Sequence, residues 1–316
     1  MARVLITRRL PDGGLDELAV AGHDLVGPKP DDAPFTPEEL LEHAASVDAM
    51  ITLLTDRIDE TILAKGAAAN LRIVANVAVG YDNIDWRAAQ QLGVRVSNTP
   101  GVLDETTADT AFLLILAAAR LASTAEADLR NGRWPGWGIN QYLGVDVHGA
   151  TLGVVGFGRI GRAVAARASG FGMRVLHHSR HDSGSPGYVA DLDELLRQSD
   201  IVTLHTPGGP DTQHLIDDRR LRLMPSHAVL VNTARGTVVD EAALAAALHE
   251  RRLFAAGIDV YEREPAVHPD LLTAPNTVLL PHIGSASQAT RRAMAQLAAN
   301  AVIATLAGAT PPDLVF

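Results

Sequence analysis

Residues 151–161 read Thr151-Leu152-Gly153-Val154-Val155-Gly156-Phe157-Gly158-Arg159-Ile160-Gly161. An apolar run here leads into three glycines spaced Gly-x-Gly-x-x-Gly, and residues 162–168 then read as a helix. In a strand–loop–helix unit the first glycine permits a tight turn, the second lets backbone N–H groups approach a pyrophosphate, and the third lets the helix pack on the strand. The helix N-terminus adds partial positive charge. This context predicts a dinucleotide site rather than an ordinary glycine-rich turn.

Apolar runs alternate with helical segments along nearly the whole chain. The expected strands are residues 4–7, 49–53, 72–77, 151–155, 174–177, 201–204, 228–232, 255–259 and 278–280. They are too uniformly apolar for strands with one exposed face, and they fit parallel sheets covered by helices on both faces. Helix starts are readable: Thr36-Pro37-Glu38-Glu39 has an N-cap, a proline and a capping-box glutamate, and Asp240 precedes an expected helix at 241–250. The pattern predicts doubly wound α/β architecture.

Length and spacing predict two domains. At roughly 150 residues per domain, 316 residues correspond to about two. Two long helical stretches, about 105–121 and 287–307, flank the central βα array, and an irregular stretch at 131–149 follows the first. We expect residues 99–286 to form an inserted dinucleotide-binding domain. Residues 1–98 together with 287–316 would form the substrate domain.

Composition excludes several classes of protein. The net charge of −10 argues against nucleic acid or an anionic membrane as the main partner. The absence of cysteine excludes disulfides, thiolate nucleophiles and Cys-ligated metals, and no metal site is expected. Neither Lys29 nor Lys65 lies in a P-loop. The longest apolar run, 111–119, is about half of the ~20 residues that a membrane span needs, and the N-terminus lacks a signal-peptide core. We expect a soluble cytoplasmic protein.

The end of the next strand bears on which dinucleotide is bound. An acid about 20 residues past the loop would bind the ribose hydroxyls of NAD. Here the strand ends in Ser179-Arg180-His181, although Asp182 could supply an acid slightly further along. Ser179 can hydrogen-bond a 2′-phosphate and Arg180 can pair with it in a bidentate way. The sequence therefore favours NADP(H), with NAD(H) possible.

Three later strand ends carry groups suited to redox chemistry on an anionic carbonyl compound. They contribute Arg235, several acids within residues 257–265, and His282. Arg235 can clamp a carboxylate, and His282 can give a proton to a carbonyl oxygen. A carboxylate bonded to that imidazole favours its protonated form. Each residue alone is commonly structural; their joint occurrence at successive strand ends is what points to catalysis.

The chain resembles the D-isomer-specific 2-hydroxyacid dehydrogenase family, and within it the glyoxylate/hydroxypyruvate reductase branch. The motifs that carry the resemblance span nearly the whole length. They are residues 75–85 (Ala75 to Asp85), 98–103 (Asn98 to Leu103), Thr107-Ala108-Asp109, the glycine-rich loop, 232–236 (Asn232 to Gly236), 259–265 (Asp259 to Pro265) and 281–286 (Pro281 to Ala286). The resemblance implies two doubly wound parallel-sheet domains, Rossmann and flavodoxin-like, with the active-site cleft between them.

The resemblance also implies residue roles. The catalytic residues would be Arg235, which binds substrate, and His282 with its partner Glu264. Further substrate contacts would come from Leu53, from the backbone N–H groups of Val79 and Gly80, and from Trp137, which would reach a neighbouring subunit's active site. The cofactor contacts would be Thr107, Gly156, Phe157, Gly158, Arg159, Ile160, Gly161, Ser179, Arg180, His205, Thr206, Pro207, Thr212, Thr233, Ala234, Asp259, His282 and Gly284. The family is typically dimeric, through the helical stretch that includes 105–121.

One segment departs from the family pattern: Pro207-Gly208-Gly209 stands where Pro-Leu-Thr is usual, which removes side chains beside the cofactor phosphates.

The leading hypothesis is an NADPH-dependent reductase of glyoxylate, hydroxypyruvate or a similar 2-oxo acid, giving the D-2-hydroxy acid. A phosphite dehydrogenase on the same fold is an alternative. A formate dehydrogenase is disfavoured because Glu264, not Gln, precedes Pro265. A third hypothesis is a dinucleotide-sensing protein resembling transcriptional corepressors, because a fold alone does not determine function.

Overall fold

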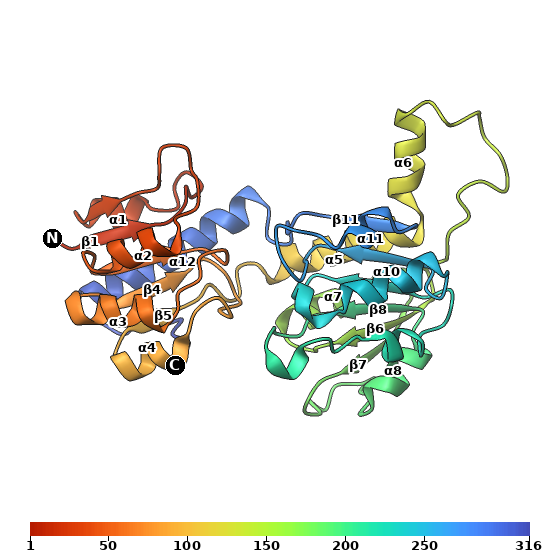
Figure 1. The fold of residues 1–316 in the computed structure, drawn as a ribbon. Helices are drawn as coiled ribbons and strands as arrows, with labels where there is room; N and C mark the ends of the chain where they lie inside the picture. The colour runs from red at the N-terminus through yellow and green to blue at the C-terminus, as the bar shows by residue number, and fades with distance from the viewer. The chain divides into compact units, whose positions relative to one another are not determined.

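The computed structural model describes residues 1–316, which divide into two compact units (Figure 1). Unit 1 consists of Met1–Leu103 and Ser285–Phe316, and unit 2 consists of Asp104–Gly284. These limits lie within a few residues of the expected domain limits.

Unit 1 is built on a five-stranded parallel sheet with the order β2-β1-β3-β4-β5. Its strands are β1 Arg3–Ile6, β2 Asp24–Val26, β3 Ala49–Thr52, β4 Ile73–Asn76 and β5 Arg95–Ser97. Its helices are α1 Asp16–Val20, α2 Pro37–Ala44, α3 Glu60–Ala69, α4 Trp86–Leu92 and α12 Gln288–Leu306. Helices α2, α3 and α4 share one core with the sheet, while α12 packs against β3, β4 and α1. The strand order is that of flavodoxin-like sheets.

The two strands that the sequence did not predict, β2 and β5, are the edges of this sheet. Each has three residues, and each includes a charged one, Asp24 or Arg95. An edge strand is partly solvated, so it lacks the continuous apolar run by which the central strands were recognised.

Unit 2 contains a six-stranded parallel sheet with the order β11-β10-β9-β8-β6-β7. Its strands are β6 Thr151–Val155, β7 Arg174–His178, β8 Ile201–Leu204, β9 Val229–Asn232, β10 Ala255–Ile258 and β11 Thr277–Leu279. Its α-helices are α5 Asp104–Ala119, α6 Ala122–Arg130, α7 Arg159–Ala168, α8 Leu192–Gln198, α9 Asp218–Leu221, α10 Glu241–His249 and α11 Pro269–Thr273. Short 3₁₀ turns occupy η1 Ser169–Phe171, η2 Pro210–Thr212 and η3 Gly236–Val238.

Both faces of this sheet are buried, which explains the uniformly apolar strands. Alternate residues of each strand belong to two different cores: Val154 faces the core that includes α5 and α7, whereas Val155 faces the one that includes α8 and α10. Val231 and Leu230 divide in the same way on β9. Because parallel strands with helices on both sides have no solvated face, this arrangement confirms the predicted doubly wound fold.

Two helical predictions differ from the structure. The stretch expected as one helix over 105–121 is broken: α5 ends at Ala119, Leu121 adopts a left-handed φ of 54°, and α6 then begins at a bend of 68°. Helix α7 begins at Arg159, three residues before the expected Arg162, because its N-cap is the second loop glycine, Gly158. Conversely, the predicted capping box at Thr36 is present and starts α2. No single helix is long and apolar enough to cross a membrane; only the bent pair α5 and α6 meets that length and composition together.

Candidate active site

The glycine-rich loop joins β6 to α7, and two of its three glycines are required by contacts within the protein. Gly156 has a φ of +94°, and a Cβ on it would lie 2.6 Å from the carbonyl carbon of His205. A Cβ on Gly161 would lie 2.2 Å from the carbonyl oxygen of Gly156, whereas one on Gly158 would meet nothing within 4 Å. Helix α7 has no side-chain cap at its N-terminus. The loop therefore leaves backbone N–H groups and open space at a helix start, which fits the pyrophosphate of a dinucleotide.

The strand next to β6 is β8, and the chain order reverses between them, which is where ligands bind in open α/β sheets. Three predicted cofactor contacts at the ends of β8 and the adjacent β9 carry buried polar atoms without a partner in the protein: Nδ1 of His205, Oγ1 of Thr206 and Oγ1 of Thr233. Buried polar atoms are normally hydrogen-bonded. Their clustering here is a second observation that fits a polar cofactor.

His205 is neutral in this position. As a residue it is half-buried, but its Nδ1 is inaccessible to solvent, and its Nε2 lies 2.9 Å from the hydroxyl of Thr203. Burial lowers the pKa of His205 to about 3. The ring therefore brings no positive charge to this part of the site near neutral pH.

The end of β7 carries the residues expected at the adenosine end of the cofactor. Ser179 donates a hydrogen bond from Oγ to the carbonyl of His181 at 2.7 Å. Arg180 is 79% exposed and lies 3.9 Å from the exposed carboxylate of Asp211. Such a pair contributes little to stability in water, so the guanidinium can turn to an incoming phosphate.

Several predicted cofactor contacts are held in place by neighbouring residues. Phe157 stacks on His177 with ring centroids 3.8 Å apart, and Arg159 pairs with Asp104 at 3.1 Å. The hydroxyl of Thr212 donates to the carbonyl of Pro207 at 2.8 Å, closing the segment that contains Gly208 and Gly209. These bonds shape the loops that border β6 and β8. On the far side, a Cβ on Gly284 would lie 3.5 Å from the Cγ2 of Thr107 in α5.

The structure brings His282 and Glu264 together although 18 residues separate them. Nδ1 of His282 lies 2.8 Å from Oε2 of Glu264, and Oε1 of Glu264 accepts the N–H of Tyr261 at 3.0 Å. Burial alone would raise the pKa of Glu264, but the hydrogen bond and charge of His282 outweigh it, with a smaller contribution from Arg235, and hold that pKa below its usual value. Glu264 is thus an anion that orients the imidazole.

His282 sits on a strained turn that Asp259 holds. The φ of His282 is 53°, unusual for a residue with a side chain. Its N–H donates to the carbonyl of Asp259, and the buried Asp259 carboxylate accepts the N–H groups of Ile283 at 2.7 Å and Gly284 at 2.8 Å. Burial raises the pKa of Asp259 despite these bonds. Asp259, expected as a cofactor contact, thus has a structural task as well, which the sequence did not reveal.

Arg235 follows β9, the strand next to β10. One of its guanidinium nitrogens donates to the carbonyl of Ala234 at 2.8 Å. The β9, β10 and β11 ends therefore supply the guanidinium, the carboxylate and the imidazole in neighbouring positions along one edge of the sheet.

The predicted substrate residues of unit 1 lie on two loops joined by a network of side-chain amides. Nδ2 of Asn83 donates to the carbonyls of Leu53 and Asp56, and Nδ2 of Asn76 donates to the carbonyl of Gly80 and to Asn83. The buried carboxylate of Asp56 accepts the N–H of Leu53 at 2.8 Å. The two loops therefore form one rigid element.

Within that element, the carbonyl of Val79 accepts the Asn98 amide at 2.7 Å. The N–H groups of Val79 and Gly80 have no partner within unit 1. The asparagines Asn76 and Asn83 were not predicted; their only signal was their place within a quoted family motif.

Trp137 lies far along a segment that leaves the body of unit 2. Helix α6 and the chain after it extend away from the sheet (Figure 1). This segment holds Leu129, Trp134, Trp137, Ile139 and Leu143, all exposed, with Trp137 exposed by 80%.

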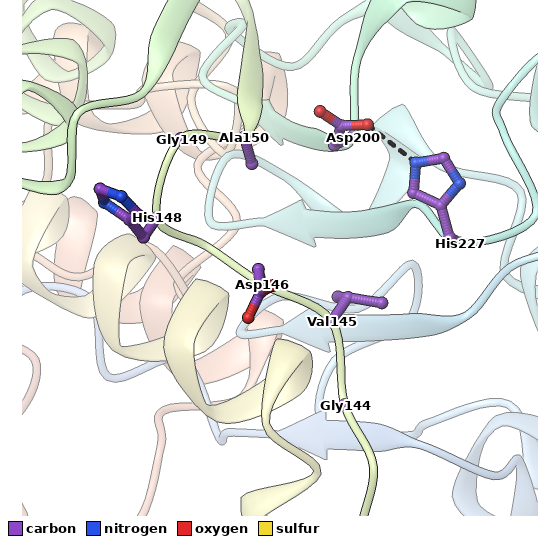
Figure 2. A pocket seen from close by; sticks show the side chains of 8 residues that line it. All are labelled: Gly144, Val145, Asp146, His148, Gly149, Ala150, Asp200 and His227. Carbon is purple, nitrogen blue, oxygen red and sulfur yellow. Dashed lines mark hydrogen bonds and ion pairs between the residues drawn. The ribbon is translucent and has the colours of Figure 1, made fainter.

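A pocket of about 410 Å³ lies at the opposite edge of the unit 2 sheet (Figure 2). Asp200, which directly precedes β8, binds His227 there at 2.8 Å. The remaining lining residues are Gly144, Val145, Asp146, His148, Gly149 and Ala150. The pocket includes no predicted site residue, and it lies at the amino ends of the strands rather than at the carboxyl ends.

The NAD-binding-domain model of the D-isomer specific 2-hydroxyacid dehydrogenases matches residues 112–284. A glyoxylate reductase of Thermococcus onnurineus is 46% identical over 99% of this chain and 95% of its own length. The chain belongs to the D-isomer-specific 2-hydroxyacid dehydrogenase family. As an NAD(P)-dependent D-2-hydroxyacid dehydrogenase, it acts on small 2-oxo or 2-hydroxy acids.

Solved structures agree with membership of this family. A protein of Thermus thermophilus matches with a TM-score of 0.93 and 42% identity, covering 99% of this chain and 100% of that one. An NADPH-dependent glyoxylate/hydroxypyruvate reductase from Sinorhizobium meliloti, in complex with NADP and malonate, matches with a TM-score of 0.85 and 33% identity, covering 99% and 96%. The comparisons thus support the predicted family, its glyoxylate reductase branch and its enzymatic activity, over the corepressor-like alternative.

Proposed function

We propose that this dehydrogenase reduces glyoxylate or hydroxypyruvate to the D-2-hydroxy acid and uses NADPH in preference to NADH. The observation that carries the proposal is the 2.8 Å bond between His282 and Glu264, which makes an oriented proton donor at the strand end beside that of Arg235. The names of the relatives support the substrate class.

The bound dinucleotide would supply hydride to the carbonyl carbon. Around it, Arg235 would hold the substrate carboxylate in a fixed plane, and His282 would give its proton to the carbonyl oxygen. Glu264 would keep the imidazole oriented for that transfer. We assign the N–H groups of Val79 and Gly80 to the same substrate carboxylate, because these donors have no partner within their own unit.

Residues around the glycine-rich loop would hold the cofactor. The N-terminus of α7 would bind the pyrophosphate, and the orphaned hydroxyls of Thr206 and Thr233 would gain partners. Ser179 and Arg180 would bind the 2′-phosphate that distinguishes NADPH from NADH.

Initial rates test the substrate and the cofactor together. We expect turnover of glyoxylate and hydroxypyruvate with NADPH, slower turnover with NADH, and none of phosphite. Turnover of phosphite alone would establish the alternative enzyme.

The variant His282→Ala should abolish turnover while NADPH still binds, and equal loss of both would contradict the proton-donor role. The variant Arg180→Ala should weaken NADPH binding and leave NADH binding unchanged.

We also propose that the enzyme is a homodimer. The apolar side chains on α6 and the following segment form an exposed surface of the kind that marks a protein interface. Most of α5, by contrast, packs into the core of unit 2, so the interface would lie beyond the helix named by the family resemblance. Light scattering should give twice the 33.4 kDa chain mass, and a Trp134→Ser, Trp137→Ser double variant should lower it.

A further inference from the structure

One buried carboxylate holds both ends of the loop that carries Glu264. Glu241, the first residue of α10, is only 6% exposed. Its Oε1 accepts the N–H of Glu262, and its Oε2 accepts the N–H of His268 at 3.1 Å. In return, Oε1 of Glu262 accepts the N–H of Glu241 at 2.9 Å. The side chain therefore bridges the start and the end of residues 261–268.

The loop closed in this way also contacts the segment that carries His282. Tyr261 donates from Oη to the carbonyl of Leu280 at 2.9 Å, two residues before His282. Its N–H donates to the carboxylate of Glu264. A displacement of Tyr261 would thus move both members of the His282–Glu264 pair.

A third contact joins this loop to the Arg235 segment. A Cβ on Gly236 would lie 1.8 Å from the carbonyl carbon of Tyr261, so the two backbones touch directly. Glu241 lies at the other end of the segment that begins at Arg235. It bonds to Glu262, the residue that follows Tyr261. Residues 235–241 and 261–268 are consequently fixed to each other at two places.

We propose that Glu241 is a positioning residue for the proton donor, acting through the loop rather than on the substrate. The inference rests on the proposed function of His282 and Glu264. A carboxylate has two acceptor oxygens and serves both loop ends, whereas an amide has one acceptor oxygen and turns N–H groups toward the other donor. Leaving a buried backbone N–H without an acceptor favours relaxation of the loop. A shift of about 1 Å in a catalytic group can cost on the order of 10²-fold in rate.

The variant Glu241→Gln tests this, with Asp240→Asn as the matched control. Asp240 is the adjacent acid and caps α10 through Ala243, so its variant keeps the cap and reports what the loss of one negative charge at this helix start does. With glyoxylate and NADPH, Glu241→Gln should lower kcat by on the order of 10²-fold. The glyoxylate KM and the NADPH Kd, measured by fluorescence quenching, should change little. Asp240→Asn should stay near wild type in all three.

Equal kcat values for the two variants would overturn the proposal. If Glu241→Gln does not fold, Glu241→Asp takes its place, since it keeps the charge but withdraws it by one methylene; wild-type kcat in that variant would also overturn it. Glu264→Gln and His282→Ala belong in the same assay. Retained turnover in those two would refute the proposed function itself, whereas their loss beside an unaffected Glu241 variant refutes only the positioning role.

Discussion

The half-buried histidine at the end of β8 should make the stability of unit 2 depend on pH. His205 has a pKa of about 3 in the folded protein, against about 6.5 for an unfolded chain. The unfolded state therefore binds a proton that the folded state excludes, and stability is lost as pH falls from 6.5 toward 3. Each unit of pKa difference corresponds to about 1.4 kcal/mol. Between pH 7 and pH 5, this one ring should remove about 2 kcal/mol from the free energy of unfolding.

Urea unfolding of the apo protein at pH 7, 6 and 5 measures this effect, with the wild type compared with His205→Gln. The transition of unit 2 is the one that added dinucleotide shifts, because a ligand stabilises the unit it binds. The glutamine has no proton to gain, so the wild-type advantage at pH 7 should shrink by about 2 kcal/mol at pH 5.

His181→Gln, a change at an exposed histidine in the same unit, is the control and should follow the wild type at every pH. The variants are compared with one another because other groups also change the free energy of unfolding with pH. The raised pKa of Asp259, for example, changes it in the opposite direction as pH falls. A constant difference between wild type and His205→Gln from pH 7 to pH 5 would refute the assignment of a desolvated, neutral ring.

Two further substitutions probe the loops. Asn83→Ala removes four hydrogen bonds, two to the carbonyls of Leu53 and Asp56 and two with the side chain of Asn76. At about 1 kcal/mol for each lost bond, it should destabilise unit 1 by about 4 kcal/mol in calorimetry and raise the glyoxylate KM. An unchanged melting temperature would contradict the network. Gly208→Ala places a Cβ 2.9 Å from the Cγ of Arg235, so it should displace the guanidinium. The glyoxylate KM should rise about tenfold while the NADPH Kd stays unchanged. A glyoxylate KM equal to that of the wild type would show that Arg235 tolerates the contact.

The fold could be predicted because the central strands are apolar on both faces. Val154 and Val155 point into different cores, so neither position tolerates a polar residue, and the run is visible in the sequence. What could not be predicted depends on tertiary context. The helix break at Leu121 has no proline or glycine to signal it, and the edge strands β2 and β5 are too short and too polar to stand out.

For the candidate site, residue type and position at strand ends were sufficient to nominate Arg235 and His282, whereas the family resemblance selected Glu264 among several acids. The 2.8 Å pairing of the last two agrees with the expected partnership. The carboxylates that hold their backbones were not foreseen in that role. Asp259 is bonded to residues 24 and 25 positions away, and Glu241 to residues 21 and 27 positions away. No local pattern distinguishes such an acceptor from an ordinary acid at a strand end or a helix start.

The supporting carboxylates explain how this site can tolerate strain. A residue such as His282 at positive φ costs of order 1–3 kcal/mol and persists only where its surroundings over-determine it. Here Asp259 accepts two N–H groups of the following residues, and Glu264 fixes the ring from the other side. Glu264 is itself tied to Tyr261, whose loop is closed by Glu241. Because the carboxylates of Asp259, Glu264 and Glu241 all accept backbone N–H groups, the side chains that place the imidazole are themselves fixed to the main chain. A proton donor held in this way needs little reorganisation at the moment of transfer.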